Sequence, residues 1–287
     1  MHNYATPSEL KISLFNYLSS IKSSLTEQRN PMKKLKFLFG FVVIALTISA
    51  CKSDKTDIPT SCDGVHWSHN GSEDGQDKWP DLCTGFSACG DENQSPVNIT
   101  GVVTDASLPE LHFSYASTST EIENNGHAIE FTCEGGSNLT IGSMQYELLQ
   151  FHYHAKSEHQ LNGVYYPLEV HFVHRASDTD FAVVGVFFEA GEENDLFSEY
   201  LAHFPVEKGT YTDTTAIDLA SLLPENKSFY HYSGSLTTPP CSEVVQWYVL
   251  KEALTASPEQ LAQFEGILKN NYRKVQALNG RQIFSKD

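Results

Sequence analysis

Three histidines, His152, His154 and His171, are the residues of this sequence best suited to metal chemistry. The first two are two residues apart in the run 148–154, and the third lies in a second run, 168–174. Side chains alternate between the faces of a β-strand, so His152 and His154 share a face if their run is a strand. Three neutral imidazoles from two strands, with no fourth protein ligand nearby in sequence, predict a Zn²⁺ site with an open coordination position.

Two polar residues share the faces of these ligands. Gln150 stands two residues before His152, and Glu169 stands two residues before His171. An amide or carboxylate oxygen at such a position can accept the second ring N–H of a metal-binding histidine. We therefore expect both side chains to orient their neighbouring ligands.

The other histidines are weaker candidates for metal ligands. The spacing also allows His159 in place of His171, because the polar segment 156–163 resembles a turn whose direction strand geometry does not fix. His174 is three residues beyond His171, so parity places it on the opposite face. Three further histidines are expected to be structural or exposed: His112, His203 and His231.

The segments around these residues are mostly predicted strands. They are short, rich in β-branched and aromatic residues, and bounded by Gly, Asn or Pro. The predicted strands are residues 129–133, 148–154, 168–174, 181–188 and 244–250. Two helices are expected, at 195–204 and after the capping sequence Ser257-Pro-Glu-Gln260. This pattern predicts a β-dominated α+β domain with peripheral helices.

The N-terminal region has the features of a secretory signal peptide. In residues 32–50, three lysines precede the apolar run 37–48, which is too short to span a bilayer. The sequence Ile48-Ser-Ala-Cys51 resembles a bacterial lipoprotein cleavage site, although an ordinary signal peptide with a chance cysteine is the alternative. We interpret residues 1–31 as a misassigned extension upstream of Met32, and 51–61 as a lipid anchor with a polar tether.

Residues 62–287 have the length of one domain with a sizeable core. Beyond residue 50, 13 Lys and Arg stand against 34 Asp and Glu, a formal charge of −21. This balance argues against binding to nucleic acid or anionic lipid, so contact with a membrane is expected through the anchor only. The expected location is extracytoplasmic, in the periplasm or at the cell surface, and the oligomeric state stays open, a dimer included.

Five cysteines remain once Cys51 is assigned to the anchor. A secreted domain favours disulfides, and an odd number leaves one thiol over. Spacing alone does not assign the pairs.

Many short motifs of this sequence, in the same order, resemble those of the α-class carbonic anhydrases. The resemblance covers about residues 65–285. The matching segments are Gln94-Ser-Pro-Val-Asn-Ile99, Asn124-Asn-Gly-His127, Gln150-Phe-His-Tyr-His154, Ser157-Glu-His159, Leu168-Glu-Val-His-Phe-Val-His174, Gly234-Ser-Leu-Thr-Thr-Pro-Pro-Cys241, Val245-Gln-Trp247 and Asn271-Tyr-Arg273.

The resemblance implies zinc-dependent, reversible hydration of CO₂ to bicarbonate and a proton. It implies a large, twisted, mostly antiparallel sheet of about ten strands. His152, His154 and His171 would bind Zn²⁺, with His154 donating to the backbone carbonyl of Asn271. The metal would lower the pKa of a bound water, an effect for which carbonic anhydrase is itself the standard example.

By resemblance, two residues would aim the nucleophile. The hydroxyl of Thr237 would donate to Glu158, which forces its other side to act as an acceptor; Thr238 would line the site. CO₂ is apolar and needs an apolar wall. The residues implied for it are Val173, Val183, Leu236, Val245 and Trp247.

The proton produced must reach the solvent. His127 matches the proton-shuttling histidine, and Asn125 would support a chain of water molecules leading to it. The sequence departs from the family at Trp67-Ser68-His69, where a tyrosine is usual in place of His69. A histidine there would change the proton-transfer rate or its pH profile, or act as a second shuttle.

The resemblance also pairs Cys89 with Cys241. Cys62 and Cys83 would then form a second pair, and Cys133 would be a buried free thiol.

Two other functions compete with catalysis. A catalytically silent, carbonic-anhydrase-like surface binding domain would lose one or more zinc histidines, and all three are kept here. A periplasmic zinc carrier commonly has a His-rich loop, which the sequence lacks.

The anchor can be tested directly. We expect mass spectrometry of the mature protein to find a lipid-modified cysteine at position 51, and processing to be blocked by globomycin. Cleavage elsewhere, with Cys51 unmodified, would refute the lipoprotein interpretation.

Overall fold

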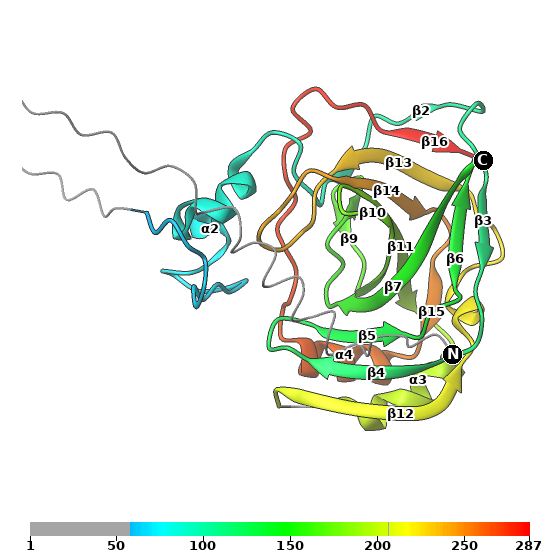
Figure 1. The fold of residues 1–287 in the computed structure, drawn as a ribbon. Coiled ribbons are helices and arrows are strands. Elements are labelled where there is room, and N and C mark those ends of the chain that lie inside the picture. The colour runs from blue at the N-terminus through cyan, green and yellow to red at the C-terminus, as the bar shows by residue number, and fades with distance from the viewer. Residues whose placement is uncertain (1–57, 206) are drawn as a thin grey trace, which may run out of the picture. The chain divides into compact units, whose positions relative to one another are not determined.

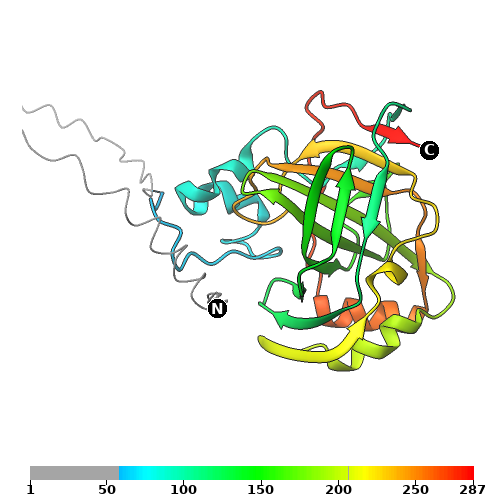
Figure 2. The same cartoon turned by 45° about the vertical axis from the view of Figure 1, so that its right-hand side comes forward.

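The computed structural model describes residues 58–205 and 207–287. Thirteen strands of these residues form one twisted sheet (Figures 1 and 2). They are β2 (Val103–Thr104), β3 (Leu111–Ser114), β4 (Thr118–Asn124), β5 (Ile129–Cys133), β6 (Asn138–Ile141), β7 (Met144–His154), β10 (Leu168–Ser177), β11 (Asp180–Ala190), β12 (Gly209–Ile217), β13 (Phe229–Gly234), β14 (Val245–Leu250), β15 (Leu254–Ala256) and β16 (Phe284–Lys286).

Ten of these strands follow one continuous order, β12-β4-β5-β7-β10-β11-β14-β13-β16-β2. Strand β15 pairs with β11, and β6 joins β3 to β7. Most neighbours are antiparallel, and the pairs β11–β14, β11–β15 and β16–β2 are parallel. A second sheet contains β1 (Asn98–Ile99), β8 (Gln160–Leu161) and β9 (Val164–Tyr165). The predicted β-dominated class is confirmed.

The sequence placed the central strands well. Strand β5 has the predicted bounds, and β7, β10 and β11 extend the predicted runs by a few residues. These runs were found because they are rich in β-branched and aromatic residues, which favour strands. The edge strand β12 and its neighbour β4 were missed, because both sequences are rich in Thr, contain acidic residues and lack an apolar run.

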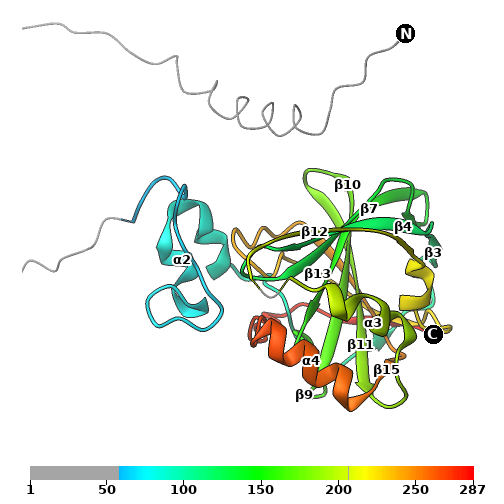
Figure 3. The same cartoon turned by 90° about the horizontal axis from the view of Figure 1, so that it is seen from below.

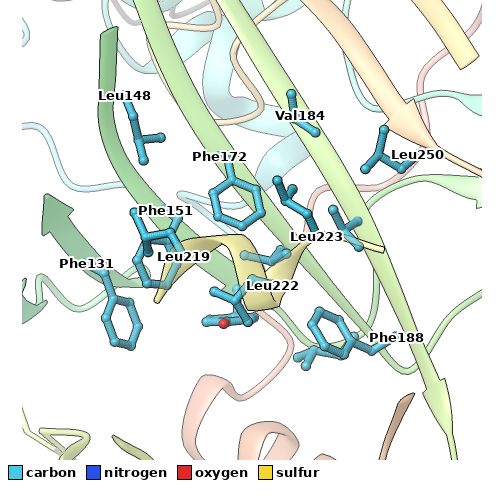
Figure 4. Close-up of a cluster of buried hydrophobic side chains, with 14 of the residues drawn as sticks. Phe131, Leu148, Phe151, Phe172, Val184, Phe188, Leu219, Leu222, Leu223 and Leu250 are labelled. Carbon is cyan, nitrogen blue, oxygen red and sulfur yellow. The ribbon is translucent and has the colours of Figure 1, made fainter. Parts of the chain in front are cut away.

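One face of the sheet covers the main hydrophobic core. Alternate residues of β7 and β10, such as Phe151 and Phe172, point into it, and the short helix η5 (Leu219–Leu222) packs against them (Figure 4). The opposite face carries a second apolar cluster that contains Val183, Val245 and Trp247. Strands β11 and β14 therefore supply residues to both clusters through their period-two alternation.

Two helices cover part of the main core, α3 (Asp195–Tyr200) and α4 (Pro258–Leu268) (Figure 3). The predicted capping box of α4 is present, with the Ser257 hydroxyl accepting from the backbone of Gln260. The rings of Phe197 and Phe264 pack 4.7 Å apart, and both contact Tyr153 of β7. The predicted helix 195–204 continues past α3 as the 3₁₀ helix η4 (Leu201–His203).

The segment that begins at residue 58 forms η2 (Gln76–Lys78), α2 (Trp79–Leu82) and η3 (Thr84–Gly90). Two disulfides hold it, Cys62–Cys83 within the segment and Cys89–Cys241 to the loop before β14. Both predicted pairs are confirmed. Cys133 is free, as expected, but it is half-buried instead of fully buried. This partial burial raises the pKa of its thiol to about 12.

The predicted signal peptide, lipid anchor at Cys51 and tether lie outside the described residues, except for positions 58–61. No helix in the described part of the chain is long and apolar enough to cross a membrane.

The two disulfides differ in the chain they enclose, with sequence separations of 21 and 152 residues. Loop-closure entropy predicts a loss of about 3 kcal/mol of unfolding free energy for Cys62→Ser with Cys83→Ser, and of about 5 kcal/mol for Cys89→Ser with Cys241→Ser. Urea unfolding measures both. Cys133→Ser is the control for losing a thiol outside a disulfide, and equal midpoints for both double variants and the wild type would contradict the expectation.

Candidate functional site

The register of β7 and β10 brings the three histidines together. His171 is directly opposite His152 in the antiparallel pair. The ring of His154 lies 4.9 Å from that of His152 and 4.6 Å from that of His171, centroid to centroid. One nitrogen from each ring lies within 4.8 Å of those of the other two. The period-two argument and the strand register thus produce one compact cluster.

The second nitrogen of each ring has a fixed partner. Gln150 Oε1 lies 2.8 Å from Nδ1 of His152. The backbone carbonyl of Asn271 lies 2.7 Å from Nδ1 of His154. For both rings, this contact places the hydrogen on Nδ1 and leaves Nε2 as the free acceptor.

The third ring is held the other way round. Glu169 Oε1 lies 2.9 Å from Nε2 of His171, so its Nδ1 is the nitrogen left for a ligand. The carboxylate fits because the next strand has Gly185 opposite His171. A Cβ at Gly185 would lie 2.8 Å from Glu169 Oε1, which is too close. The glycine therefore makes room for the group that orients the ligand.

Asn271 also uses its side chain here. Its Oδ1 accepts the backbone N–H of Ala155, and its Nδ2 donates to the carbonyl of Tyr153. The residue therefore fixes the end of β7 on both sides of His154.

Burial keeps the three imidazoles neutral, which is the form that binds a metal. It lowers the pKa of His154 to about 4 and that of His152 well below its ordinary value. Burial also lowers the pKa of His171, although Glu169 opposes this effect. All three are therefore uncharged at neutral pH.

Glu158 lies fully buried beside the cluster. Its Oε1 accepts the backbone N–H of Arg273 at 2.7 Å. Its Oε2 has no hydrogen-bond partner among the described residues, and lies 3.6 Å from Nε2 of His154 and 3.9 Å from Nδ1 of His171. Burial raises the pKa of this carboxyl to about 6, while His171, the Arg273 N–H and the Thr237 side chain lower it.

Two groups of the described residues could hold a metal by proximity alone, and their hydrogen bonds distinguish them. The second group is His159, Glu169 and His171. There Glu169 is already engaged, because its Oε1 contacts both rings and its Oε2 accepts the backbone N–H groups of Glu158 and His159. His159 also bonds to the hydroxyl of Tyr232 at 2.7 Å. This group is a closed hydrogen-bonded chain, which excludes His159 as an available ligand.

Zinc fits the first group. Three neutral imidazole nitrogens are a donor set that Zn²⁺ accepts with a position left open. Among the described residues, Nε2 of His154 is a buried polar atom without a hydrogen-bond partner, which is costly unless something else satisfies it. The donor set and this atom together point to a metal.

The side chains expected to face CO₂ gather on the same face of the sheet. Val183, Val245 and Trp247 belong to the second apolar cluster, with Val173 and Leu236 packed against it. The ring of Trp247 lies 4.8 Å from that of His171. Thr237 is buried and Thr238 half-buried in the loop that the Cys89–Cys241 disulfide holds. The apolar wall therefore borders the histidine cluster directly.

His127 lies in a separate, more open part of the site. It lines a cavity of about 320 Å³ with residues that include His66, His69, Asn124 and Asn271. Its ring stacks on Trp67 at 3.8 Å, a contact that the sequence did not reveal because the two residues are 60 positions apart.

Asn125 does not line this cavity, although its neighbour Asn124 does. The Oδ1 of Asn125 accepts the backbone N–H groups of His127 and Ala128. In the structure Asn125 therefore shapes the turn that presents His127.

The unusual His69 is packed between two indole rings. It makes edge contacts with Trp67 at 5.4 Å and with Trp79 at 5.7 Å. Burial, aided by nearby His154, His127 and Arg273, lowers its pKa to about 3. The ring is then neutral at physiological pH, which argues against a second shuttle at this position.

The histidines expected to be structural have protein contacts of their own. His174 is buried on the face opposite His171, with the Tyr115 hydroxyl 2.7 Å from its Nε2. His231 Nδ1 contacts the carbonyl of Trp247. His112 and His203 are exposed.

A mixed β-sheet with a buried three-histidine site beside an apolar wall defines a metal-binding enzyme scaffold. The family model of eukaryotic-type carbonic anhydrases matches residues 74–287. A carbonic anhydrase of Pectobacterium atrosepticum is 38% identical over 85% of this chain and 98% of its own. The chain belongs to the eukaryotic-type, or α-class, carbonic anhydrase family.

Solved structures agree with this assignment. A hyperthermostable carbonic anhydrase from a hydrothermal vent chimney matches with a TM-score of 0.74 and 41% identity, over 77% of this chain and all of its own. The α-carbonic anhydrase of Thermovibrio ammonificans, solved with the inhibitor sulfanilamide, has a TM-score of 0.74 and 40% identity, over 77% of this chain and 99% of its own. The predicted enzyme class, with hydration of CO₂ as its activity, is confirmed.

The contact between Gln150 and His152 predicts a change in metal affinity. Gln150→Ala should weaken zinc binding about 10- to 100-fold, because the imidazole loses the partner that fixes its orientation. Competition with a chromogenic chelator measures this. Gln145→Ala, on an exposed position of the same strand, is the matched control. Equal affinities for the two variants would show that Gln150 does not orient the ligand.

Proposed function

We propose that this protein hydrates CO₂ with a zinc ion held by His152 and His154 through Nε2 and by His171 through Nδ1. The observation that carries the proposal is the convergence of three neutral imidazoles beside the buried carboxylate of Glu158. When bound, zinc supplies Lewis acidity that makes water a nucleophile near neutral pH, an effect for which carbonic anhydrase is the standard example.

Glu158 and Thr237 orient the nucleophile in this proposal. Glu158 is held by the backbone of Arg273, so its free oxygen has a defined position. A hydroxyl has one hydrogen, and when Thr237 donates it to the carboxylate, only its lone pairs remain for the nucleophile. Thr237 then accepts a hydrogen from the nucleophile and leaves the attacking lone pair directed at CO₂. Thr238 borders the same space.

The apolar wall holds the substrate without a charged partner. CO₂ has no net charge, so contact with Val183 and Trp247 positions it while excluding competing water. Bicarbonate is charged and gains nothing from such a wall, which favours its release. The apolar wall thus favours the binding of CO₂ over that of bicarbonate.

His127 carries the proton to solvent in this proposal. It is half-buried and lines a cavity open to solvent, with its ring supported by Trp67. An imidazole accepts a proton and releases it readily near neutral pH. Burial, Lys208 and His66 lower the pKa of His127, which favours release.

The proposal places the enzyme outside the cytoplasm, on a lipid anchor at Cys51. It is supported by the signal-like sequence of residues 32–50 and by the two disulfides of the domain. Which membrane face carries the enzyme does not affect the chemistry above.

Stopped-flow CO₂ hydration on residues 58–287 tests the mechanism. We expect rapid hydration that a chelator abolishes and added zinc restores. His127→Ala should lower kcat on the order of 10²-fold in dilute buffer and leave kcat/KM unchanged, because only the proton-transfer step slows. Imidazole buffer should restore kcat.

His112→Ala, on an exposed part of β3, is the control and should keep wild-type kcat. Hydration that is insensitive to the chelator would refute the zinc mechanism. An unchanged kcat for His127→Ala in dilute buffer would refute the shuttle.

A further inference from the structure

A second histidine lies outside His127 on the way to solvent. The ring centroids of His66 and His127 are 6.0 Å apart, and both residues line the same cavity. The side chain of His66 is 68% exposed, whereas His127 is half-buried. The two rings therefore form an inner and an outer position along one path.

His66 is paired with a carboxylate. Its Nδ1 lies 2.7 Å from Oδ2 of Asp74. The carboxylate accepts the Nδ1 hydrogen, so Nε2 of the neutral ring is the nitrogen that can take up a proton. The Nδ1 hydrogen stays bonded to Asp74 when Nε2 takes up a proton, so the ring keeps its orientation.

Two hydrogen bonds with Ser68 fix the position of Asp74. Its Oδ1 accepts from the hydroxyl of Ser68, and its carbonyl accepts the backbone N–H of the same serine. Gly71 closes the turn, and a Cβ there would lie 1.7 Å from Asp74 Oδ1. Only a glycine leaves room for the carboxylate, so the turn is shaped around it.

The disulfide between Cys62 and Cys83 closes the loop that carries the pair. Trp67, in the same loop, stacks on His127, so the loop holds the inner ring and the outer pair together. The acid and the two histidines thus form one preorganised unit.

We propose that His66, held by Asp74, is a second proton carrier that receives the proton from His127 and passes it to solvent. This inference rests on the proposed role of His127. A water molecule between the rings takes the proton from the His127 imidazolium and gives one to Nε2 of His66. His66 then loses that proton to buffer, and both rings are neutral again.

Other charged groups around the path set its direction. Lys208 lies near His127, where it disfavours the imidazolium. Asp74 contacts Nδ1 of His66. Glu207 and the neutral His69 line the same cavity. The positive charge of Lys208 therefore favours moving a proton away from His127.

The first test uses the metal-free protein and needs no activity. Long-range ¹H–¹⁵N NMR should find neutral His66 with its hydrogen on Nδ1. In Asp74→Ala the hydrogen should move mainly to Nε2, because its acceptor is gone. Asp77→Ala is the matched control, since Asp77 is exposed in the same loop but pairs with Lys274. A wild-type ring with its hydrogen on Nε2 would overturn the proposal.

The second test uses the zinc-loaded enzyme in dilute buffer. His66→Ala and Asp74→Ala should each lower kcat about fivefold and leave kcat/KM unchanged. This effect is smaller than that of His127→Ala, because His127 is still present in both variants and can release its proton directly. Adding His66→Ala to His127→Ala should lower kcat no further, because the outer carrier acts only through the inner one.

The outcomes separate the two proposals. If His127→Ala lowers kcat and His66→Ala does not, only the outer carrier is refuted. If His127→Ala has no effect on kcat, the shuttle and the outer carrier both fail. A fall in kcat/KM for His66→Ala would show a structural effect on the site and would also overturn the proposal.

Discussion

The antiparallel register between β7 and β10 is the constraint on which the site depends. It sets His152 opposite His171, and it sets Glu169 opposite His154. If either strand shifted by one residue, its site residues would turn into the main core and its phenylalanines would turn toward the histidine cluster. The large core therefore does more than stabilise the fold, because it fixes the register by which the ligands meet.

The hydrogen bonds that orient His154 and Glu158 come from groups that are distant in sequence. The C-terminal residues Asn271 and Arg273 use their backbones to hold His154 and Glu158. The buried guanidinium of Arg273 in turn bonds to Gln94 and to the carbonyls of Ser95 and Cys89. One short segment thereby joins the N-terminal region, the carboxylate and a metal ligand into a single network.

The sequence predicted the parts of this site that follow from local rules. Alternation along a strand was enough to place Gln150 and the ligands on one face, since it depends only on neighbouring residues. The choice between His171 and His159 was not local, because it depends on a turn and on the contact of His159 with Tyr232. Resemblance to a family supplied that choice, and strand parity could not have done so.

The parts that the sequence did not predict arise from long-range packing. The stacking of Trp67 on His127 joins two loops, and the pairing of His66 with Asp74 depends on a turn in which Gly71 leaves room for the carboxylate. The low pKa of His69 likewise follows from its burial between indoles and not from its neighbours in the chain. Such features need the folded coordinates, because no periodicity in the sequence encodes them.

Because residues 271–273 bond to His154 and Glu158, the site can form only at a late stage of chain synthesis. A ribosome that makes this chain from its N-terminus completes all three histidines about a hundred residues before it makes Asn271. Until then, His154 lacks the carbonyl that orients it and Glu158 lacks its backbone donor. The finished geometry can therefore form only after nearly the whole chain exists, so capture of the metal in this geometry belongs to the end of folding and not to its nucleation.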